Sequence, residues 1–177
     1  RDCATKGFFY GLGKYGIGIS WIYVSISSFS NAPFIFAIAI TLLFIIFISI
    51  YELLLATIFH FFFNNKSSLK KVIGFAILAS IFEWLRGHLF SGFPWLFISY
   101  SQIDTPISGL APIIGSYGLS FITYLISCSL AQGLFVRTRN PSHSYSFLAA
   151  FIMPFLLLSP LLGINWTTPL KKNLSFQ

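Results

Sequence analysis

Long apolar runs separated by short polar segments dominate the sequence. A helix that crosses the hydrocarbon core of a bilayer needs about 20 mostly apolar residues. Five runs meet that length, and they cover approximately residues 7–29, 33–63, 71–90, 111–136 and 145–164. The pattern therefore predicts an all-α integral membrane protein, a polytopic bundle of about five transmembrane helices.

Residues 91–110, SGFPWLFISYSQIDTPISGL, interrupt this pattern between the third and fourth runs. Gly92 and Pro94 end the preceding helix, and no helical period follows them. Irregular backbone is tolerated at membrane depth only where protein buries it or where it lines a wet cavity. We therefore expect an irregular loop that either folds onto the bundle from outside or dips into the outer leaflet.

Small residues and prolines modify two of the runs. Gly7 and Gly11 have the small-xxx-small spacing that lets two membrane helices approach closely. This spacing predicts a packing contact in the first run rather than a catalytic role. In the fifth run, Pro154 and Pro160 are expected to kink or shorten the helix.

The lysines and arginines between the runs predict how the chain lies in the membrane. Successive segments between the spans lie on alternating sides of the membrane. Seven of the basic residues fall on one side: Arg1, Lys6, Lys66, Lys70, Lys71, Arg137 and Arg139. The opposite side has only Lys171 and Lys172, in the tail. Because cytoplasmic loops carry the excess of basic residues, we expect the start of the chain in the cytoplasm and the 91–110 loop and tail outside it.

The composition supports a membrane protein and argues against binding to nucleic acid. Hydrophobic residues make up 56% of the chain and charged residues 8%, and the mean hydropathy is +0.82. A soluble domain carries about a quarter charged residues, so the apolar excess is expected to face lipid. The net charge of +7 is divided among the segments between apolar runs. Because it forms no basic stripe or block, nucleic acid is not an expected partner.

Two ionisable residues lie well inside predicted spans. Lys14 is about two turns into the first span from its cytoplasmic end, and Glu52 is about three turns into the second. An ionisable group at the centre of a span costs about 2.5–3.5 kcal/mol on insertion scales and usually finds a partner. We expect Lys14 and Glu52 to form a structural ion pair between adjacent helices. The alternative is that Lys14 extends to the interface and Glu52 is neutral.

Glu83 and Arg86 lie one helical turn apart near the outer end of the third span. One interpretation is a mutual ion pair that only supports the helix. The other is that the two side chains order the irregular backbone that follows them. In that case the segment provides a place where a lipid headgroup meets Arg86, Tyr100 and Gln102 while the acyl chains remain in the bilayer.

The sequence offers no set of catalytic or metal-binding residues. His60, His88 and His143 are far apart and lack the spacing of metal ligands, so no metal is expected. Cys3 and Cys128 form no disulfide framework, and Cys128 lies in an apolar run as a packing residue. The chain offers no Ser-His-Asp or Cys-His catalytic arrangement whose residues would all lie on the same side of the membrane.

Several motifs in a fixed order resemble those of one enzyme family. They are GFFYGLGKYGIGISWIYVSI at 7–26, EWLRG at 83–87, SGFPWL at 91–96, YSQID at 100–104 and GLAPIIG at 109–115. Together they resemble the apolipoprotein N-acyltransferases of the bacterial inner membrane. The resemblance covers nearly the whole chain.

The resemblance implies a fold and an activity. In this family a multi-span membrane portion carries an extracytoplasmic nitrilase-like domain with a Glu-Lys-Cys catalytic set. Its cysteine takes an acyl chain from a phospholipid as a thioester and passes it to the N-terminal diacylglyceryl-cysteine of a lipoprotein. No cofactor is needed. The implied partners are therefore the phospholipid donor, the lipoprotein acceptor and the bilayer itself.

Compared with the family pattern, this chain lacks two initial spans, the nitrilase-like domain and a final span. Residues 1–164 correspond to the transmembrane bundle, and residues 165–177 resemble an exit segment leading to the missing domain. No catalytic residue is therefore expected in the chain, which alone is predicted to be inactive. Lys14 and Glu52 replace residues expected to be apolar, so the resemblance assigns them no role.

The resemblance also implies a set of residues at the rim of the lipid and lipoprotein entry site. They are Glu83, Arg86, Pro94, Trp95, Tyr100, Ser101 and Gln102. The alternative is a rigid loop that only seats the catalytic domain on the membrane. Two other functions remain open from the residues alone, a small polytopic transporter and a structural membrane subunit. The absence of visible repeats disfavours the transporter.

Overall fold

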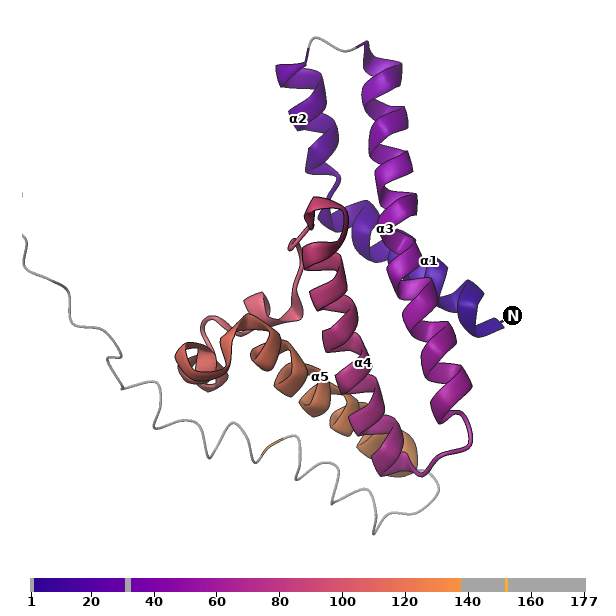
Figure 1. Ribbon diagram of the computed structural model, residues 1–177, viewed down its shortest axis with the longest axis vertical. Coiled ribbons are helices and arrows are strands. Elements are labelled where there is room, and N and C mark those ends of the chain that lie inside the picture. The colour runs from indigo at the N-terminus through magenta and orange to yellow at the C-terminus, as the bar shows by residue number, and fades with distance from the viewer. Residues whose placement is uncertain (1, 31–32, 138–151, 153–177) are drawn as a thin grey trace, which may run out of the picture.

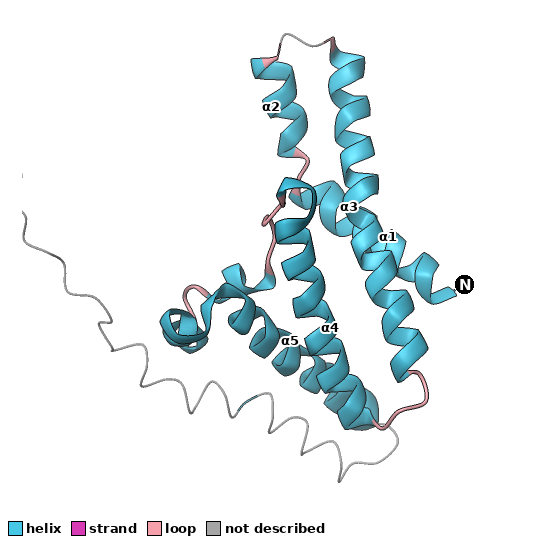
Figure 2. Ribbon diagram, viewed as in Figure 1, coloured by secondary structure: helices cyan, strands magenta, loops and turns pink. Residues whose placement is uncertain are grey.

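The protein is a bundle of α-helices in the computed structural model, which describes residues 2–30, 33–137 and 152 (Figure 1). The helices are α1 (Asp2–Gly18), α2 (Trp21–Phe29), α3 (Phe34–Phe63), α4 (Ser68–His88) and α5 (Ala111–Arg137). Within this part of the chain no strand occurs (Figure 2). The predicted all-α class is therefore confirmed for the described residues.

Three helical stretches are long and apolar enough to cross a membrane. They are Phe34–Phe63, Ser68–Ser91 and Pro106–Leu134, which agree with the second, third and fourth predicted spans. The fifth predicted span, 145–164, lies outside the described residues apart from residue 152, and the exit segment, 165–177, lies wholly outside them.

The first predicted span, 7–29, is not one continuous helix. α1 has 17 residues and α2 has nine, so each is shorter than the about 20 residues that a span requires. Between them, a Cβ atom on Gly18 would collide with the side chain of Leu96. The indole Nε1 of Trp95 donates a hydrogen bond to the Gly18 carbonyl at 3.3 Å. The 93–98 segment thus packs against the end of α1 and supplies a partner for a carbonyl there, which hydropathy could not predict.

Close packing of α1 against α3 depends on the two predicted glycines. A Cβ atom on Gly7 would lie 2.6 Å from the Glu52 carbonyl oxygen, and one on Gly11 would lie 2.9 Å from the Cα atom of Ser49. Side chains at these positions would push the two backbones apart, so the predicted small-residue contact is confirmed. Because rising residue numbers in α1 meet falling numbers in α3, the two helices are antiparallel.

The helices form two packed pairs. α1 packs across α3, and α5 packs along α4, while residues 64–67 connect α3 to α4 at one end of the bundle (Figure 1). A core of Tyr15, Ile19, Ile45 and Ile48 holds the first pair together. A second core of Ile107, Leu119 and Ile126 lies in α5 and the segment before it.

The predicted irregular segment contains no α-helix in the structure. Three short 3₁₀ helices follow α4, η1 (Leu89–Ser91), η2 (Ile98–Gln102) and η3 (Pro106–Leu110). Gly92 has a φ of 76°, in the left-handed region that favours glycine, and a Cβ atom there would collide with the Gly87 carbonyl. The N–H of Phe93 then donates to the Arg86 carbonyl at 2.8 Å. This tight turn folds residues 93–98 back onto the bundle.

Candidate functional site

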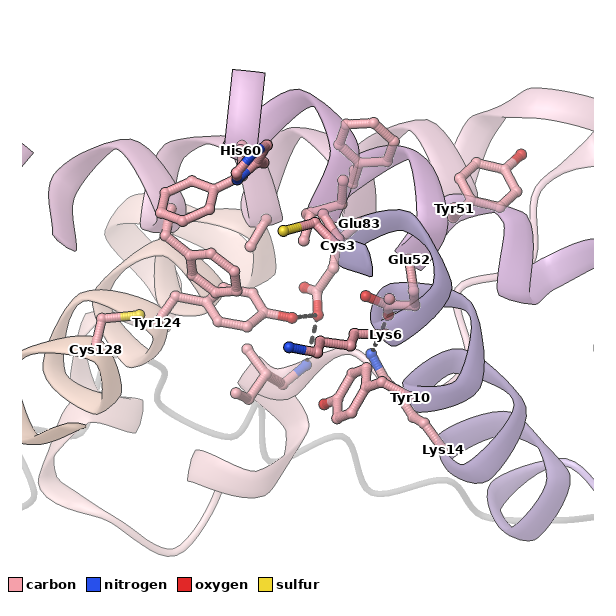
Figure 3. Close-up of a pocket in the computed structure, with 18 of the residues that line it drawn as sticks. Cys3, Lys6, Tyr10, Lys14, Tyr51, Glu52, His60, Glu83, Tyr124 and Cys128 are labelled. Carbon is pink, nitrogen blue, oxygen red and sulfur yellow. Dashed lines mark hydrogen bonds and ion pairs between the residues drawn. The ribbon is translucent and has the colours of Figure 1, made fainter. Parts of the chain in front are cut away.

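A cavity of about 710 Å³ opens between the α1–α3 pair and the α4–α5 pair. Figure 3 shows Lys6, Tyr10 and Lys14 of α1 across the cavity from Glu83 and Tyr124. Most of its wall surface is apolar, but six charged side chains also line it, Lys6, Lys14, Glu52, Lys71, Glu83 and Arg86. Small-molecule sites commonly combine apolar walls with placed polar groups.

Lys14 and Glu52 meet at one wall of the cavity. The Lys14 Nζ atom lies 2.8 Å from Oε1 of Glu52, and the Tyr15 hydroxyl donates to the same oxygen at 3.0 Å. The two charged side chains are 20% and 14% exposed, so water screens them little. The pair thereby links α1 to α3 beside the close contact at Gly7.

We expect the Lys14–Glu52 contact to stabilise the bundle through direct coupling. Lys14→Met and Glu52→Gln should each destabilise the protein, and the double variant should lose less than the sum of the two. The expected coupling energy is about 1–2 kcal/mol, within the range for contacting residues. Unfolding in detergent of the four proteins of the cycle measures it. Additive losses would contradict a direct interaction.

Arg86 binds the backbone that follows α4. Its side chain is 3% exposed. Nη1 donates to the carbonyls of Phe93, at 3.1 Å, and of Trp95, while Nη2 lies 3.5 Å from the Leu96 carbonyl. A guanidinium presents five N–H donors in a fixed plane, so one buried cation can hold several carbonyls at once.

Aromatic rings surround the same guanidinium. Its central carbon lies 5.4 Å from the centroid of the Tyr15 ring and 5.0 Å from that of Phe97. Both distances are within the range of cation–π attraction. Arg86 therefore connects α1, α4 and the 93–98 segment.

Glu83 holds the same segment from its other end. Its Oε1 atom accepts hydrogen bonds from the N–H of Ile98 at 3.0 Å and from the Tyr124 hydroxyl at 2.9 Å. Its Oε2 atom is buried without a hydrogen-bond partner among the described residues. Although one turn apart, Glu83 and Arg86 do not pair with each other. They order the backbone instead, which is the second of the two interpretations above.

A second cavity, of about 520 Å³, lies beside the 93–98 segment. Among the rim residues implied by the resemblance, Trp95, Tyr100 and Ser101 line this second cavity. Glu83 and Arg86 line the first cavity.

The other two implied rim residues line neither cavity. Pro94 is exposed, and Gln102 makes local bonds within the loop. Its Nε2 atom donates to Ser101 Oγ at 2.8 Å, and its Oε1 accepts from the Thr105 hydroxyl at 3.2 Å.

Three residues in this network were not singled out from the sequence. Tyr15 bonds to Glu52 and lies against Arg86, Tyr124 bonds to Glu83, and Phe97 packs on Arg86. A signal existed for the two tyrosines. Each lies inside an apolar run rather than at its interfacial end, and a buried phenol needs a hydrogen-bond partner. Nothing in the sequence distinguishes Phe97 from the many other phenylalanines.

The arrangement is suited to binding and positioning rather than to covalent chemistry. Lys14 and Arg86 balance the charges of Glu52 and Glu83, and most of their polar atoms bind protein groups. Cys3 and Cys128 are free thiols that line the first cavity. Within the described ranges, no three His, Cys, Asp or Glu side chains are grouped as metal ligands.

Comparison with known proteins gives consistent matches. A family model described as the apolipoprotein N-acyltransferase N-terminal domain matches residues 1–129. A protein of Coxiella burnetii named apolipoprotein N-acyltransferase is 38% identical over 165 residues, covering 93% of this chain and 34% of that protein. A protein of the same name from Pseudomonas syringae pv. tomato is 37% identical, covering 96% and 33%. The chain therefore spans about a third of the length of these curated relatives.

Proposed function

The chain belongs to the apolipoprotein N-acyltransferase family, and from that premise we propose that it admits a phospholipid acyl donor and presents it to a catalytic domain outside this sequence. That domain would transfer the acyl chain through a cysteine thioester to the diacylglyceryl-cysteine of a lipoprotein. In this proposal the chain contributes no catalytic residue. It is the membrane portion and supplies the rim of the entry site.

The observation that carries the proposal is the anchoring of the rim. Arg86 and Glu83 bind the backbone of residues 93–98 from α4. The Trp95 ring then lies 5.2 Å, centroid to centroid, from that of Trp21 in α2. Next to it, Tyr100 and Ser101 line the second cavity. Amphipathic aromatic rings beside hydroxyl groups suit a molecule with a polar head and apolar chains.

The proposal includes an orientation in the bacterial inner membrane. Lys6 lies near the start of α1, Lys66 lies in the turn between α3 and α4, and Lys70 and Lys71 lie in the first turn of α4, at the end of that helix away from residues 91–110. The positive-inside rule favours the cytoplasm for that end. The second cavity would then face the outer leaflet and the periplasm, where the catalytic domain is expected.

Substitution of Trp95 tests the role of the rim. In the natural full-length protein, Trp95→Ala should slow formation of the acyl-enzyme from labelled phospholipid about tenfold, a barrier change of about 1.4 kcal/mol. The ring would no longer pack on Trp21 or bond to Gly18. Gln102→Ala should have a smaller effect, because Gln102 bonds only within its loop.

Trp84→Ala is the matched control. Trp84 is an equally exposed tryptophan that stacks on His88 and lines neither cavity. Its variant should form acyl-enzyme at the normal rate. Normal accumulation in both the Trp95 and Gln102 variants would leave the segment only a seating role, against the proposal.

A further inference from the structure

We propose that Lys14 is the subsite that binds the phosphate of a phospholipid in the second cavity. The Lys14 ammonium would donate to a phosphodiester oxygen, while the apolar part of the lipid packs on the exposed rings of Trp95 and Tyr100. This role is additional to the ion pair of Lys14 with Glu52. The inference rests on the proposed function, because it assumes that lipid enters the second cavity.

Lys14 supplies the positive charge of the second cavity. Of the described residues that line this cavity, Lys14 is the one with a charged side chain. The two acids closest to it in the network, Glu52 and Glu83, line the first cavity and not the second. A cavity lined by charge of one sign attracts a ligand group of the opposite sign. The second cavity therefore favours an anionic group.

Lys14 also lies close to the rim at Trp95. It precedes Gly18 by four residues, or about 6 Å along α1, and the Gly18 carbonyl accepts the hydrogen bond from the Trp95 indole. Figure 3 shows Lys14 beside Tyr10, on the same helix. The two cavities adjoin at this point, because four residues line both of them: Tyr10, Lys14, Ile98 and Tyr124.

The Lys14 ammonium retains donors for a ligand. It carries three N–H groups, and its one hydrogen bond among the described residues is to Oε1 of Glu52 at 2.8 Å. The ion pair therefore restrains the side chain without using all of its donors. The centroid of the Tyr10 ring lies 6.0 Å from Nζ. Within the described part of the chain, the hydroxyls of Tyr10 and Tyr100 make no hydrogen bond and can donate to the same anion.

The remaining wall of the second cavity selects an amphiphile. Leu96 and Ile98 line it together with the exposed rings of Trp95 and Tyr100. A free phosphate would leave this apolar surface uncovered, whereas a diacylglycerol would offer no anion to Lys14. A phosphodiester that carries apolar chains satisfies both parts of the wall.

Lipid binding to the natural full-length protein tests the inference. The probe is the ether-linked analogue of phosphatidylglycerol, whose chains cannot be transferred, and native mass spectrometry in neutral detergent measures its Kd. Lys14→Met should weaken binding at least about tenfold, because a charged hydrogen bond is lost. Lys14→Arg should restore most of the affinity. The glycerol diether with the same chains and no phosphate should bind wild type and Lys14→Met equally, and glycerophosphoglycerol should bind neither at the same concentration.

Two control variants separate phosphate binding from stability and from surface charge. Glu52→Gln breaks the same ion pair as Lys14→Met but keeps the ammonium and removes a competing carboxylate. It should therefore bind the phospholipid analogue at least as tightly as wild type. Lys70→Met removes an exposed cation that lines neither cavity and should have no effect. All Kd values are measured below the melting temperature of every variant.

Three results would overturn the inference. An equal loss of binding in Lys14→Met and Glu52→Gln would show that Lys14 acts only by holding α1 to α3. Unchanged binding in Lys14→Met would show that the phosphate has another partner. Binding of glycerophosphoglycerol as tight as that of the lipid would indicate a site for a free phosphodiester.

Trp95→Ala distinguishes failure of this inference from failure of the proposed function. If Trp95→Ala weakens binding of both ether lipids but Lys14→Met changes neither, lipid still enters at the rim and only the lysine subsite is wrong. If Trp95→Ala binds both lipids as wild type does, entry at the rim is contradicted, and the proposed function fails with it.

Discussion

Arg86→Met is expected to lower the free energy of unfolding in detergent by about 3 kcal/mol, because charged hydrogen bonds contribute about 1.5–3 kcal/mol each and some freed carbonyls will rebind water. The guanidinium donates to carbonyls at three positions of the 93–98 segment. Methionine keeps an unbranched apolar stem near Tyr15 and Phe97 but donates nothing. The segment should detach before the helices separate.

Two measurements follow the effect of Arg86→Met. Thermal unfolding in dodecylmaltoside reports global stability, and chymotrypsin cleavage at the aromatic residues of 93–98 reports local opening. Arg86→Lys should be intermediate, because an ammonium is a point charge without the planar set of donors. Lys66→Met removes a cation from an exposed turn and should change neither readout. Wild-type cleavage in Arg86→Met would contradict the anchoring role.

Gly92→Ala is expected to destabilise the protein by about 3 kcal/mol. A left-handed φ costs a non-glycine residue on the order of 1–3 kcal/mol. In addition, the new Cβ would collide with the backbone carbonyl of Gly87, and forced overpacking costs about 1–3 kcal/mol. The melting temperature in detergent and expression of the full-length protein measure the loss.

Gly13→Ala is the matched control for Gly92→Ala. A Cβ atom at Gly13 meets nothing within 4 Å, and the residue lies inside α1. Alanine there should be neutral or slightly stabilising, because it favours the helix over glycine by about 1 kcal/mol. If both variants melted at the wild-type temperature, the turn at Gly92 would not constrain the fold.

The sequence predicted the helices that depend on local pattern. The second, third and fourth spans agree with α3, α4 and α5 because long apolar runs in lipid must satisfy their backbone hydrogen bonds within one helix. The close contact at Gly7 and Gly11 was also predictable, because small residues at that spacing expose backbone to a neighbour. The motifs at 83–115 were sufficient to indicate the family.

The break after Gly18 could not be predicted in the same way. Apart from Lys14, the residues from 7 to 29 are compatible with a continuous membrane helix on hydropathy alone. The break is matched by contacts with Leu96 and Trp95, which are distant in sequence. A local pattern contains no information about which remote side chain will approach.

The sequence by itself determined that the chain is helical and lipid-facing, and which of its residues carry charge into the apolar spans. The sequence also predicted the pairing of Lys14 with Glu52, which lie 2.8 Å apart in the structure. Only the tertiary structure decided between the two interpretations of Glu83 and Arg86, which it directs away from each other to the backbone of residues 93–98. The physical reason is that a buried charge must be compensated, but any correctly placed donor or acceptor can do so. The choice therefore depends on how the helices pack.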